Sequence, residues 1–262
     1  MIFFVICLVS FIVATLTLFS GFGLGTLLLP TFSIFFPIEV AVGATAIVHL
    51  ANNIFKFFLV GRMADLRVTL KFTIPAAICA ALGALLLSKI GSLSPLLTYG
   101  LFGREFHIEP IKLTIGVLIA VFSLFEFVPA LERMALPERY IPIGGAISGF
   151  FGGLSGLQGA LRSMFLVRAG LNKEQFVGTT VASAIIVDLS RITVYGFAIF
   201  GRHFSELKEE GILNLIVAAT VAALVGSAFG NKLLKKTTLG TVQKIVGILL
   251  FVIALALIGG FI

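Results

Sequence analysis

Apolar positions along the chain gather into long stretches that short polar segments separate. The apolar stretches lie at about 2–36, 40–60, 70–90, 113–128, 141–168, 175–200, 212–230 and 242–262. A transmembrane helix needs about 20 predominantly apolar residues, and most of these stretches reach that length. The pattern therefore predicts an all-α polytopic membrane protein with about eight transmembrane segments.

Two of the stretches contain glycine clusters that a continuous helix would not tolerate well. The first, 2–36, would be about 50 Å long as one straight helix, whereas the hydrocarbon core of a bilayer is about 30 Å thick. It contains SGFGLG at 20–25, and the fifth stretch contains SGFFGGLSGLQG at 148–159. Glycine disfavours helix interiors and lets backbones approach closely. We therefore expect both stretches to be broken or re-entrant helices.

The chain also aligns with itself. An offset of 135 residues places 21–61 on 156–196 without a gap, and both segments contain E-x-x-V-G-x-T, at 39–45 and at 174–180. The same offset places Asn53 on Asp188 and Lys56 on Arg191. The alignment predicts two pseudo-symmetric transmembrane repeats, 1–100 and 141–262, joined by a connecting loop and linker helix at 101–140.

The distribution of loop cations distinguishes parallel from inverted repeats, because cytoplasmic loops carry an excess of lysine and arginine. If each broken stretch returns to its starting side, 11 of 16 loop cations lie on one face, whereas the best split with crossing stretches is 9 against 7. The first arrangement makes the repeats inverted, with both termini on the outer face. Inverted repeats with broken helices are typical of secondary transporters, whose sites form near the membrane midplane.

Composition supports a membrane location and excludes several classes of function. Of the 262 residues, 59% are hydrophobic and 12% charged, and the mean hydropathy is +1.15. Soluble domains are less apolar and about twice as charged. The net charge of +7 lies mostly in short loops, so it reports topology rather than nucleic-acid binding. Cys7 and Cys79 lie in apolar stretches, so neither a disulfide framework nor a cysteine metal site is expected.

Charged side chains inside the predicted spans are the first candidates for function, because each costs about 2.5–3.5 kcal/mol at the bilayer centre. His49, Asn52, Asn53 and Lys56 share one helical stripe, and Asp188 and Arg191 form an i, i+3 pair.

Arg162 lies beside the second glycine cluster. We expect Lys56, Arg162 and Arg191 to line a cavity that binds an anion, with Asp188 and His49 tuning its charge or carrying a proton. The alternative is that Lys56 extends to the membrane surface and that Asp188–Arg191 is a structural pair.

Glycine clusters and nearby polar residues complete the candidate site. Helix breaks leave backbone N–H groups that attract anions, although small residues also serve close helix packing, which we expect at Gly83 and Gly226. The additional candidate binding residues are Gly23, Gly25, Thr45, Gln158, Gly159 and Thr180, together with Asn52 and Asn53 of the stripe. No metal ligand set and no cofactor are expected.

A glycine-rich break followed by E-x-x-V-G-x-T, repeated once among eight apolar segments, resembles the TauE/SafE-type sulfite exporter family of membrane permeases. Gly21 to Pro30 and Ala41 to Thr45 follow the family pattern loosely, as do Gly156 to Phe165 and Phe176 to Thr180. Gln158, Arg162 and Phe165 depart from it. The resemblance implies transport of sulfite, sulfonates, thiosulfate or another small organic anion across the cytoplasmic membrane, and no enzymatic activity.

Two alternatives remain open. A passive anion channel needs the same cavity. A rhomboid-like intramembrane serine protease would use the G-x-S-G around Ser155 with the H-x-x-x-N of His49 and Asn53, although the one histidine after Ser155, His203, falls in a polar loop. The sequence leaves open the direction of transport, the coupling ion and the oligomeric state, a homodimer included.

Overall fold

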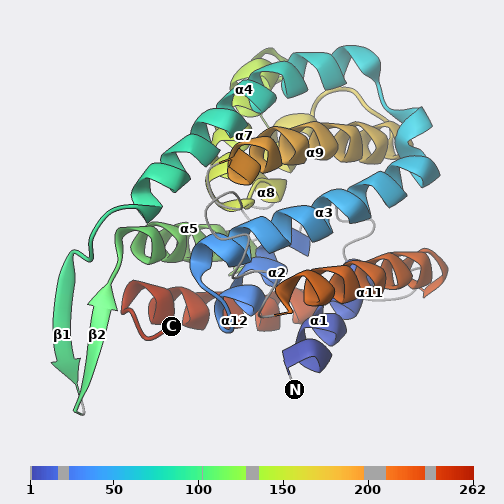
Figure 1. Ribbon diagram of the computed structural model, residues 1–262. Helices are drawn as coiled ribbons and strands as arrows, with labels where there is room; N and C mark the ends of the chain where they lie inside the picture. The colour runs from blue at the N-terminus through green and yellow to red at the C-terminus, as the bar shows by residue number, and fades with distance from the viewer. Residues whose placement is uncertain (1, 17–23, 102, 128–135, 198–210, 234–239) are drawn as a thin grey trace.

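The computed structural model of the chain describes residues 2–16, 24–101, 103–127, 136–197, 211–233 and 240–262. Its helices form one bundle with a β-hairpin projecting from one side (Figure 1). The helices are α1 (Ile2–Leu16), α2 (Leu24–Ser33), α3 (Ile38–Val60), α4 (Leu66–Gly91), α5 (Pro110–Phe127), α7 (Ile141–Ser155), α8 (Gly159–Leu166), α9 (Lys173–Tyr195), α11 (Ile212–Leu233) and α12 (Gly240–Ile258). Two 3₁₀ turns, η1 (Gly61–Met63) and η2 (Glu138–Tyr140), precede α4 and α7.

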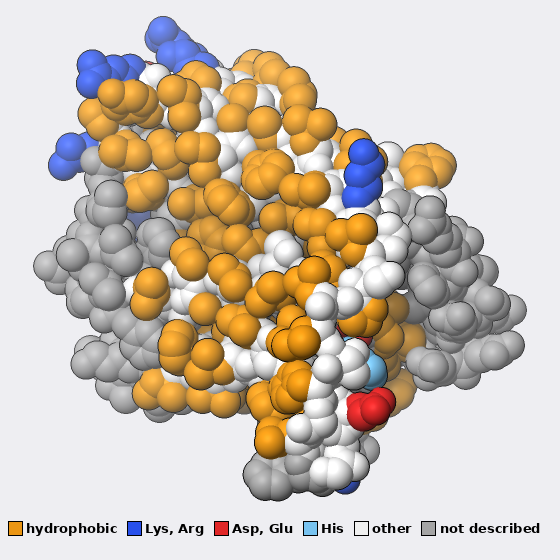
Figure 2. All heavy atoms as spheres, turned by 90° about the vertical axis from the view of Figure 1, so that its left-hand side faces the viewer, with side chains coloured by type: hydrophobic (Ala, Val, Ile, Leu, Met, Phe, Trp, Pro, Cys, Tyr) orange, Lys and Arg blue, Asp and Glu red, His pale blue; other side chains and the backbone are white. Residues whose placement is uncertain are grey.

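Helix length and surface composition agree with a membrane protein. Within the described part of the chain, four helical segments are long and apolar enough to span a bilayer: Ile38–Leu59, Leu66–Gly91, Lys173–Tyr195 and Ile212–Gly230. Shorter apolar helices accompany them. Figure 2 shows hydrophobic side chains over most of one face, with most of the visible lysine and arginine side chains at its upper left. The helical membrane class is thus established, while the count of eight spans stays a prediction.

The second glycine-interrupted stretch is a pair of helices that folds back on itself, as the re-entrant prediction requires. Helix α7 ends at Ser155, Gly156 adopts a left-handed conformation with φ +80°, and α8 begins at Gly159. The chain then returns to where α7 began, because Leu136 N donates to Met164 O at 3.1 Å and Gly144 lies against the Phe165 ring. In the first stretch α1 and α2 are separate helices, and the residues between them, Gly23 included, lie outside the described residues.

Glycines set the closest helix contacts. A Cβ added at any of three positions on α7 would collide with a backbone carbonyl of α4, the pairs being Gly145 with Phe72, Gly149 with Ala76 and Gly153 with Ala80. Gly83 on α4 likewise meets α7, and Gly226 on α11 meets the backbone of α1. Small residues allow such approach between membrane helices. The packing role expected for Gly83 and Gly226 is therefore confirmed.

Helices α3 and α9 cross the middle of the bundle as an antiparallel pair (Figure 1). His49 on α3 pairs with Asp188 on α9, and further along, beyond the end of α3, Asp65 N donates to Thr179 Oγ1 at 3.0 Å. As residue numbers rise along α3 and past its end, the numbers of the partners on α9 fall, so the two helices are antiparallel. Helix α3 belongs to the first predicted repeat and α9 to the second.

A two-stranded hairpin adds an element that the all-α prediction lacked. Strands β1 (Leu97–Leu101) and β2 (Arg104–Ile108) pair antiparallel, with Leu97 opposite Ile108. The Tyr99 hydroxyl donates to Gly259 O at 2.5 Å, and the Phe106 ring packs against Phe261 at 5.1 Å between centroids. The hairpin therefore contacts the segment that follows α12.

The bundle has two chemically different ends. At one end lie the segments around 61–71, 136–140 and 167–173, joined by contacts such as the Lys71–Glu138 ion pair at 3.7 Å. The basic residues there are Arg62, Arg67, Lys71, Arg139, Arg168 and Lys173. The hairpin lies at the opposite end of α4, 26 residues away along the helix. We call these the basic end and the hairpin end.

Candidate functional site

Asp188 is the centre of a buried hydrogen-bond cluster between α3 and α9. Its Oδ2 lies 2.6 Å from His49 Nδ1 and accepts from Asn53 Nδ2 at 3.2 Å. Its Oδ1 accepts from Arg191 Nε at 3.0 Å and from Arg191 Nη2 at 2.7 Å. Asp188 and Arg191 have no exposed surface. One carboxylate therefore joins a helix of the first predicted repeat to a helix of the second.

The polar stripe predicted on the second apolar stretch is buried along its whole length. His49, Asn52, Asn53 and Lys56 are between 1% and 8% exposed. His49 and Asn53 face α9, whereas Asn52 faces α11, where the Ser227 hydroxyl donates to its Oδ1 at 2.6 Å. The stripe thus contacts two helices of the second half. Lys56 is buried, whereas a lysine that extends to the membrane surface would have an exposed side chain.

The helix break in the second half lies directly against this cluster. A Cβ on Gly156 would touch the guanidinium of Arg191, and Arg191 Nη1 donates to Gly152 O at 3.4 Å. A Cβ on Gly25 of α2 would lie 3.2 Å from Gly156 O and 3.8 Å from His49 Cδ2. The two glycine-rich segments therefore meet at the central cluster, one from each half of the chain.

Gln158 and Gly159 form the start of α8. The Gln158 side chain is 1% exposed, and both ends of its amide lack a hydrogen bond to any described residue. A Cβ on Gly152 would lie 2.9 Å from Gln158 Oε1, which places this amide beside the residue that binds Arg191. The first N–H groups of a helix have no acceptor within it. Gly159 begins such a turn, so backbone and side-chain donors converge there.

Arg162 adds a further buried cation one turn into α8. Its side chain is 2% exposed, and its charge interacts with those of Asp188, Arg191 and Lys56. The three cations predicted from the sequence to line a cavity, Lys56, Arg162 and Arg191, therefore belong to one electrostatic cluster.

Three more predicted binding residues are buried with a polar atom that makes no hydrogen bond among the described residues: Thr45 Oγ1, Asn52 Nδ2 and Thr180 Oγ1. An unsatisfied buried polar atom costs about 1–3 kcal/mol, so such atoms indicate positions for a ligand or water. Thr45 precedes His49 by one turn, or about 6 Å, and Thr180 precedes Asp188 by about 12 Å. Because α3 and α9 are antiparallel, the two threonines lie on opposite sides of Asp188 and cannot contact the same small ion.

Two residues of the cluster escaped the sequence analysis. The Tyr195 hydroxyl donates to Gly153 O and is completely buried, one turn after Arg191. Its i+4 spacing from Arg191 places both residues on one face of α9, and this spacing could have identified Tyr195 from the sequence. Ser227 is a single hydroxyl in an apolar helix, and only the packing of α11 on α3 gives it a role.

The protease alternative finds no support in the geometry. The Ser155 hydroxyl donates to Phe151 O at 3.0 Å and accepts from Leu157 N at 3.3 Å, while His49 pairs with Asp188. Over the described ranges no histidine is bonded to Ser155, and no group of three histidine, cysteine or acidic residues could hold a metal. His203 lies outside those ranges.

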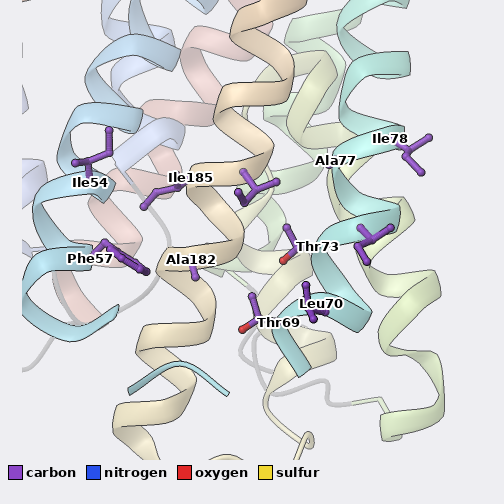
Figure 3. Close-up of a pocket in the computed structure, with 11 residues that line it drawn as sticks. Ile54, Phe57, Thr69, Leu70, Thr73, Ala77, Ile78, Ala182 and Ile185 are labelled. Atoms are coloured by element: carbon purple, nitrogen blue, oxygen red, sulfur yellow. The ribbon is translucent and has the colours of Figure 1, made fainter. Parts of the chain in front are cut away.

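A separate groove opens between α3, α4 and α9, with a volume of about 670 Å³ (Figure 3). Ile54 and Phe57 form its α3 wall, Leu70 and Ile78 belong to α4, and Ala182 and Ile185 to α9. None of its described lining residues is charged. The groove is thus distinct from the charged cluster, and the sequence analysis did not predict it.

Comparison with known families agrees with the motifs. The family model for the sulfite exporter TauE/SafE matches residues 6–257. The chain belongs to the TauE/SafE sulfite exporter family. The match confirms the resemblance drawn from the glycine-rich breaks and makes the chain a multi-pass membrane transporter of the sulfite exporter type. Searches of curated proteins and of solved structures found no match.

Proposed function

We propose that the chain is a secondary transporter that moves a small divalent oxyanion, such as sulfite, thiosulfate or a related sulfur-containing or organic anion, across the cytoplasmic membrane by alternating access. The observation that carries this proposal is the charge of the buried cluster. Among the described residues, Lys56, Arg162 and Arg191 are buried with one acid, Asp188, which leaves a formal charge of +2 when His49 is neutral. Buried charge is costly unless it is compensated, so a dianion is the ligand that neutralises the cluster.

The donors around the cluster suit an oxyanion. Guanidinium groups bind oxyanions through paired N–H donors. The Gln158 amide, the first turn of α8 and the Asn52 amide add donors that other described residues leave unused. The Gln158 amide lies beside Gly152, whose carbonyl accepts from Arg191, so its donor is available to an anion bound at Arg191.

Asp188 supports a mechanism of substrate-dependent release. Asp188 accepts from two donors of Arg191 within α9, and its other oxygen accepts from Asn53 on α3. An arriving anion competes for Arg191 and releases one carboxylate oxygen of Asp188. Asp188 is then free to change its hydrogen bonds to α3, so that substrate binding alters the contact between the two halves.

Helix pairing supports inverted repeats as the moving parts. The first helix of each half packs on a later helix of the other, α1 on α11 and α7 on α4, while α3 and α9 meet antiparallel at the centre. The exchange fits two halves related by a pseudo-two-fold axis, and the antiparallel central pair favours an axis in the membrane plane.

A thermal-unfolding screen of the purified protein tests the proposal. Sulfite, thiosulfate and sulfate are compared with chloride, nitrate, taurine and small amines at equal ionic strength. A specific dianion stabilises the native state by about 2.7 kcal/mol at a hundredfold excess over its Kd. The Arg162→Gln variant should lose the preference for dianions, whereas Arg104→Gln on the exposed hairpin should keep it. Stabilisation by amines or metal cations above every anion would contradict the proposal.

Counterflow in proteoliposomes separates a carrier from a channel. A carrier that alternates between two states takes up labelled anion faster when unlabelled anion is inside. A passive channel shows no such trans-stimulation, and that result would favour the channel alternative.

A further inference from the structure

We infer that the apolar groove between α3, α4 and α9 binds one acyl chain of an anionic phospholipid, whose phosphate is held by Arg62 and Arg67 at the basic end. This site is independent of the proposed transport site. It involves a different ligand and a different part of the bundle.

The dimensions of the groove match one membrane leaflet. Along α4 its wall extends from Thr69 to Ile78. Nine residues at 1.5 Å per residue correspond to about 13.5 Å, and half of the hydrocarbon core is about 15 Å. Its outer wall is open to lipid, since Ile74 and Ile78 are 57% and 61% exposed. The groove therefore accommodates a chain that runs from the membrane surface to the midplane.

Polarity along the groove gives the lipid a direction. Thr73 donates to Ser183 Oγ at 2.8 Å, so its hydroxyl is used within the protein. Thr69 Oγ1 makes no hydrogen bond among the described residues and lies toward the basic end of the groove. Beyond Thr73 the α4 wall is aliphatic, through Ile74, Ala77 and Ile78 (Figure 3). A glycerol ester fits beside Thr69, and the hydrocarbon continues toward Ile78.

Two arginines lie where the phosphate of such a lipid would be. Arg67 shares a face of α4 with Leu70 and Ile74, because they follow it by three and seven residues. Arg62 follows Gly61, which lies against the ring of Phe57, a groove residue on α3. Arg62 is exposed in η1, between α3 and α4, and Arg67 is exposed in the first turn of α4. Basic residues near the cytoplasmic surface attract anionic lipids, each contributing a factor of about five in affinity.

The lipid would connect the two halves of the protein. One wall of the groove belongs to α3 and α4, and the other to α9. A bound acyl chain therefore fills the lateral opening beside the α3–α9 contact, and its head group remains at the basic end.

Thermal unfolding and native mass spectrometry of the full chain in mild detergent test the site. Phosphatidylglycerol and phosphatidylcholine with identical acyl chains are added separately. We expect phosphatidylglycerol to bind more tightly and to raise the unfolding temperature more. Replacing both Arg62→Gln and Arg67→Gln should weaken phosphatidylglycerol binding by roughly 25-fold and leave phosphatidylcholine unaffected, whereas Arg104→Gln should change neither.

Variants of the groove test the acyl-chain position. Ala182→Phe fills the groove and should remove copurified lipid, while Leu249→Phe on the exposed surface of α12 should retain it. Thr69→Val preserves volume if Ala182→Phe does not fold, and should weaken both lipids. Glycerol phosphate alone should give no shift, which separates this site from the anion cluster. Equal binding of the two lipids, or an unchanged preference in the double arginine variant, would overturn the inference.

Discussion

At the residue scale, the central cluster depends on the division of Asp188 between two helices. One carboxylate oxygen accepts from Asn53 and lies beside His49 on α3, while the other accepts from the Arg191 fork on α9. Charge-assisted hydrogen bonds of this kind are stronger than neutral ones, and their geometry is specific. Conservative substitutions of Arg191 and of Asp188 should therefore have different consequences from one another.

Arg191→Lys keeps the positive charge and removes the fork. We expect normal expression and anion binding weakened by about 1.5–3 kcal/mol, or roughly tenfold to a hundredfold, because a hydrogen bond to a charged group is lost. Titration of the purified variant with the preferred dianion measures the loss, with Arg104→Lys as the control. Unchanged affinity would mean that Arg191 does not contact the substrate.

Asp188→Asn removes the carboxylate that accepts from Arg191. Loss of one partner from a buried ion pair costs about 3–5 kcal/mol, so the yield of folded protein should fall. Protein that survives should bind the anion more tightly, since the acid no longer competes for Arg191. The exposed Glu105→Gln variant controls for expression. Weaker anion binding at unchanged stability would contradict the competition between carboxylate and substrate.

At the scale of elements, close packing of α4 on α7 holds the re-entrant pair in place. Gly145, Gly149 and Gly153 present a surface without side chains to α4, and α7 can therefore place Gly156 beside Arg191. The glycine-rich stretch thus has two structural tasks, helix contact in α7 and a break at its end.

Gly149→Ala tests this contact. The new methyl group would collide with the backbone of Ala76, which cannot move aside as a flexible side chain would. We expect a loss of about 1–3 kcal/mol in stability, measured as a lower unfolding temperature. Gly196→Ala at the end of α9 is the matched control, because nothing lies within 4 Å of its Cβ position. Equal stability of the two variants would show that α7 and α4 are less tightly packed.

Local patterns allowed part of this organisation to be predicted. The glycine cluster between 148 and 159 predicted the break, and i, i+3, i+4 spacing predicted that His49 and Asn53 share a face. The separation of Thr45 from Thr180 could not be predicted, because it follows from the antiparallel packing of helices far apart in sequence. The hairpin was missed since 97–108 alternates too weakly to distinguish it from a loop, and Tyr99 gains its partner only from the end of α12.

At the scale of the whole molecule, charge distinguishes the two ends of the bundle. Arg62, Arg67 and Lys71 lie at the basic end, together with Arg139 and Lys173, whereas the hairpin lies at the other end of α4. From the positive-inside rule we expect the basic end to face the cytoplasm and the hairpin end to face the outside.

Cysteine labelling in intact cells tests the orientation. Cys7→Ser and Cys79→Ser provide a background without thiols, into which Arg62→Cys or Arg104→Cys is introduced. A membrane-impermeant thiol reagent should label position 104 from outside, and position 62 only after permeabilisation. Labelling of both positions from the same side would contradict the assignment, and the reverse pattern would invert the protein in the membrane.

The pairing of α1 with α11 has a consequence for biosynthesis. The surface of α1 that contains Phe11 and Thr15 is covered by Gly226 and Gly230, which are translated more than 200 residues later. At about 5–20 residues per second, the ribosome takes roughly 10–40 s to supply that partner. During this time α1 is in the membrane with its final contact surface uncovered, available to the insertion machinery and to neighbouring nascent helices. Premature termination before α11 would leave this surface permanently uncovered, and quality-control proteases of the membrane would have a structural reason to recognise the product.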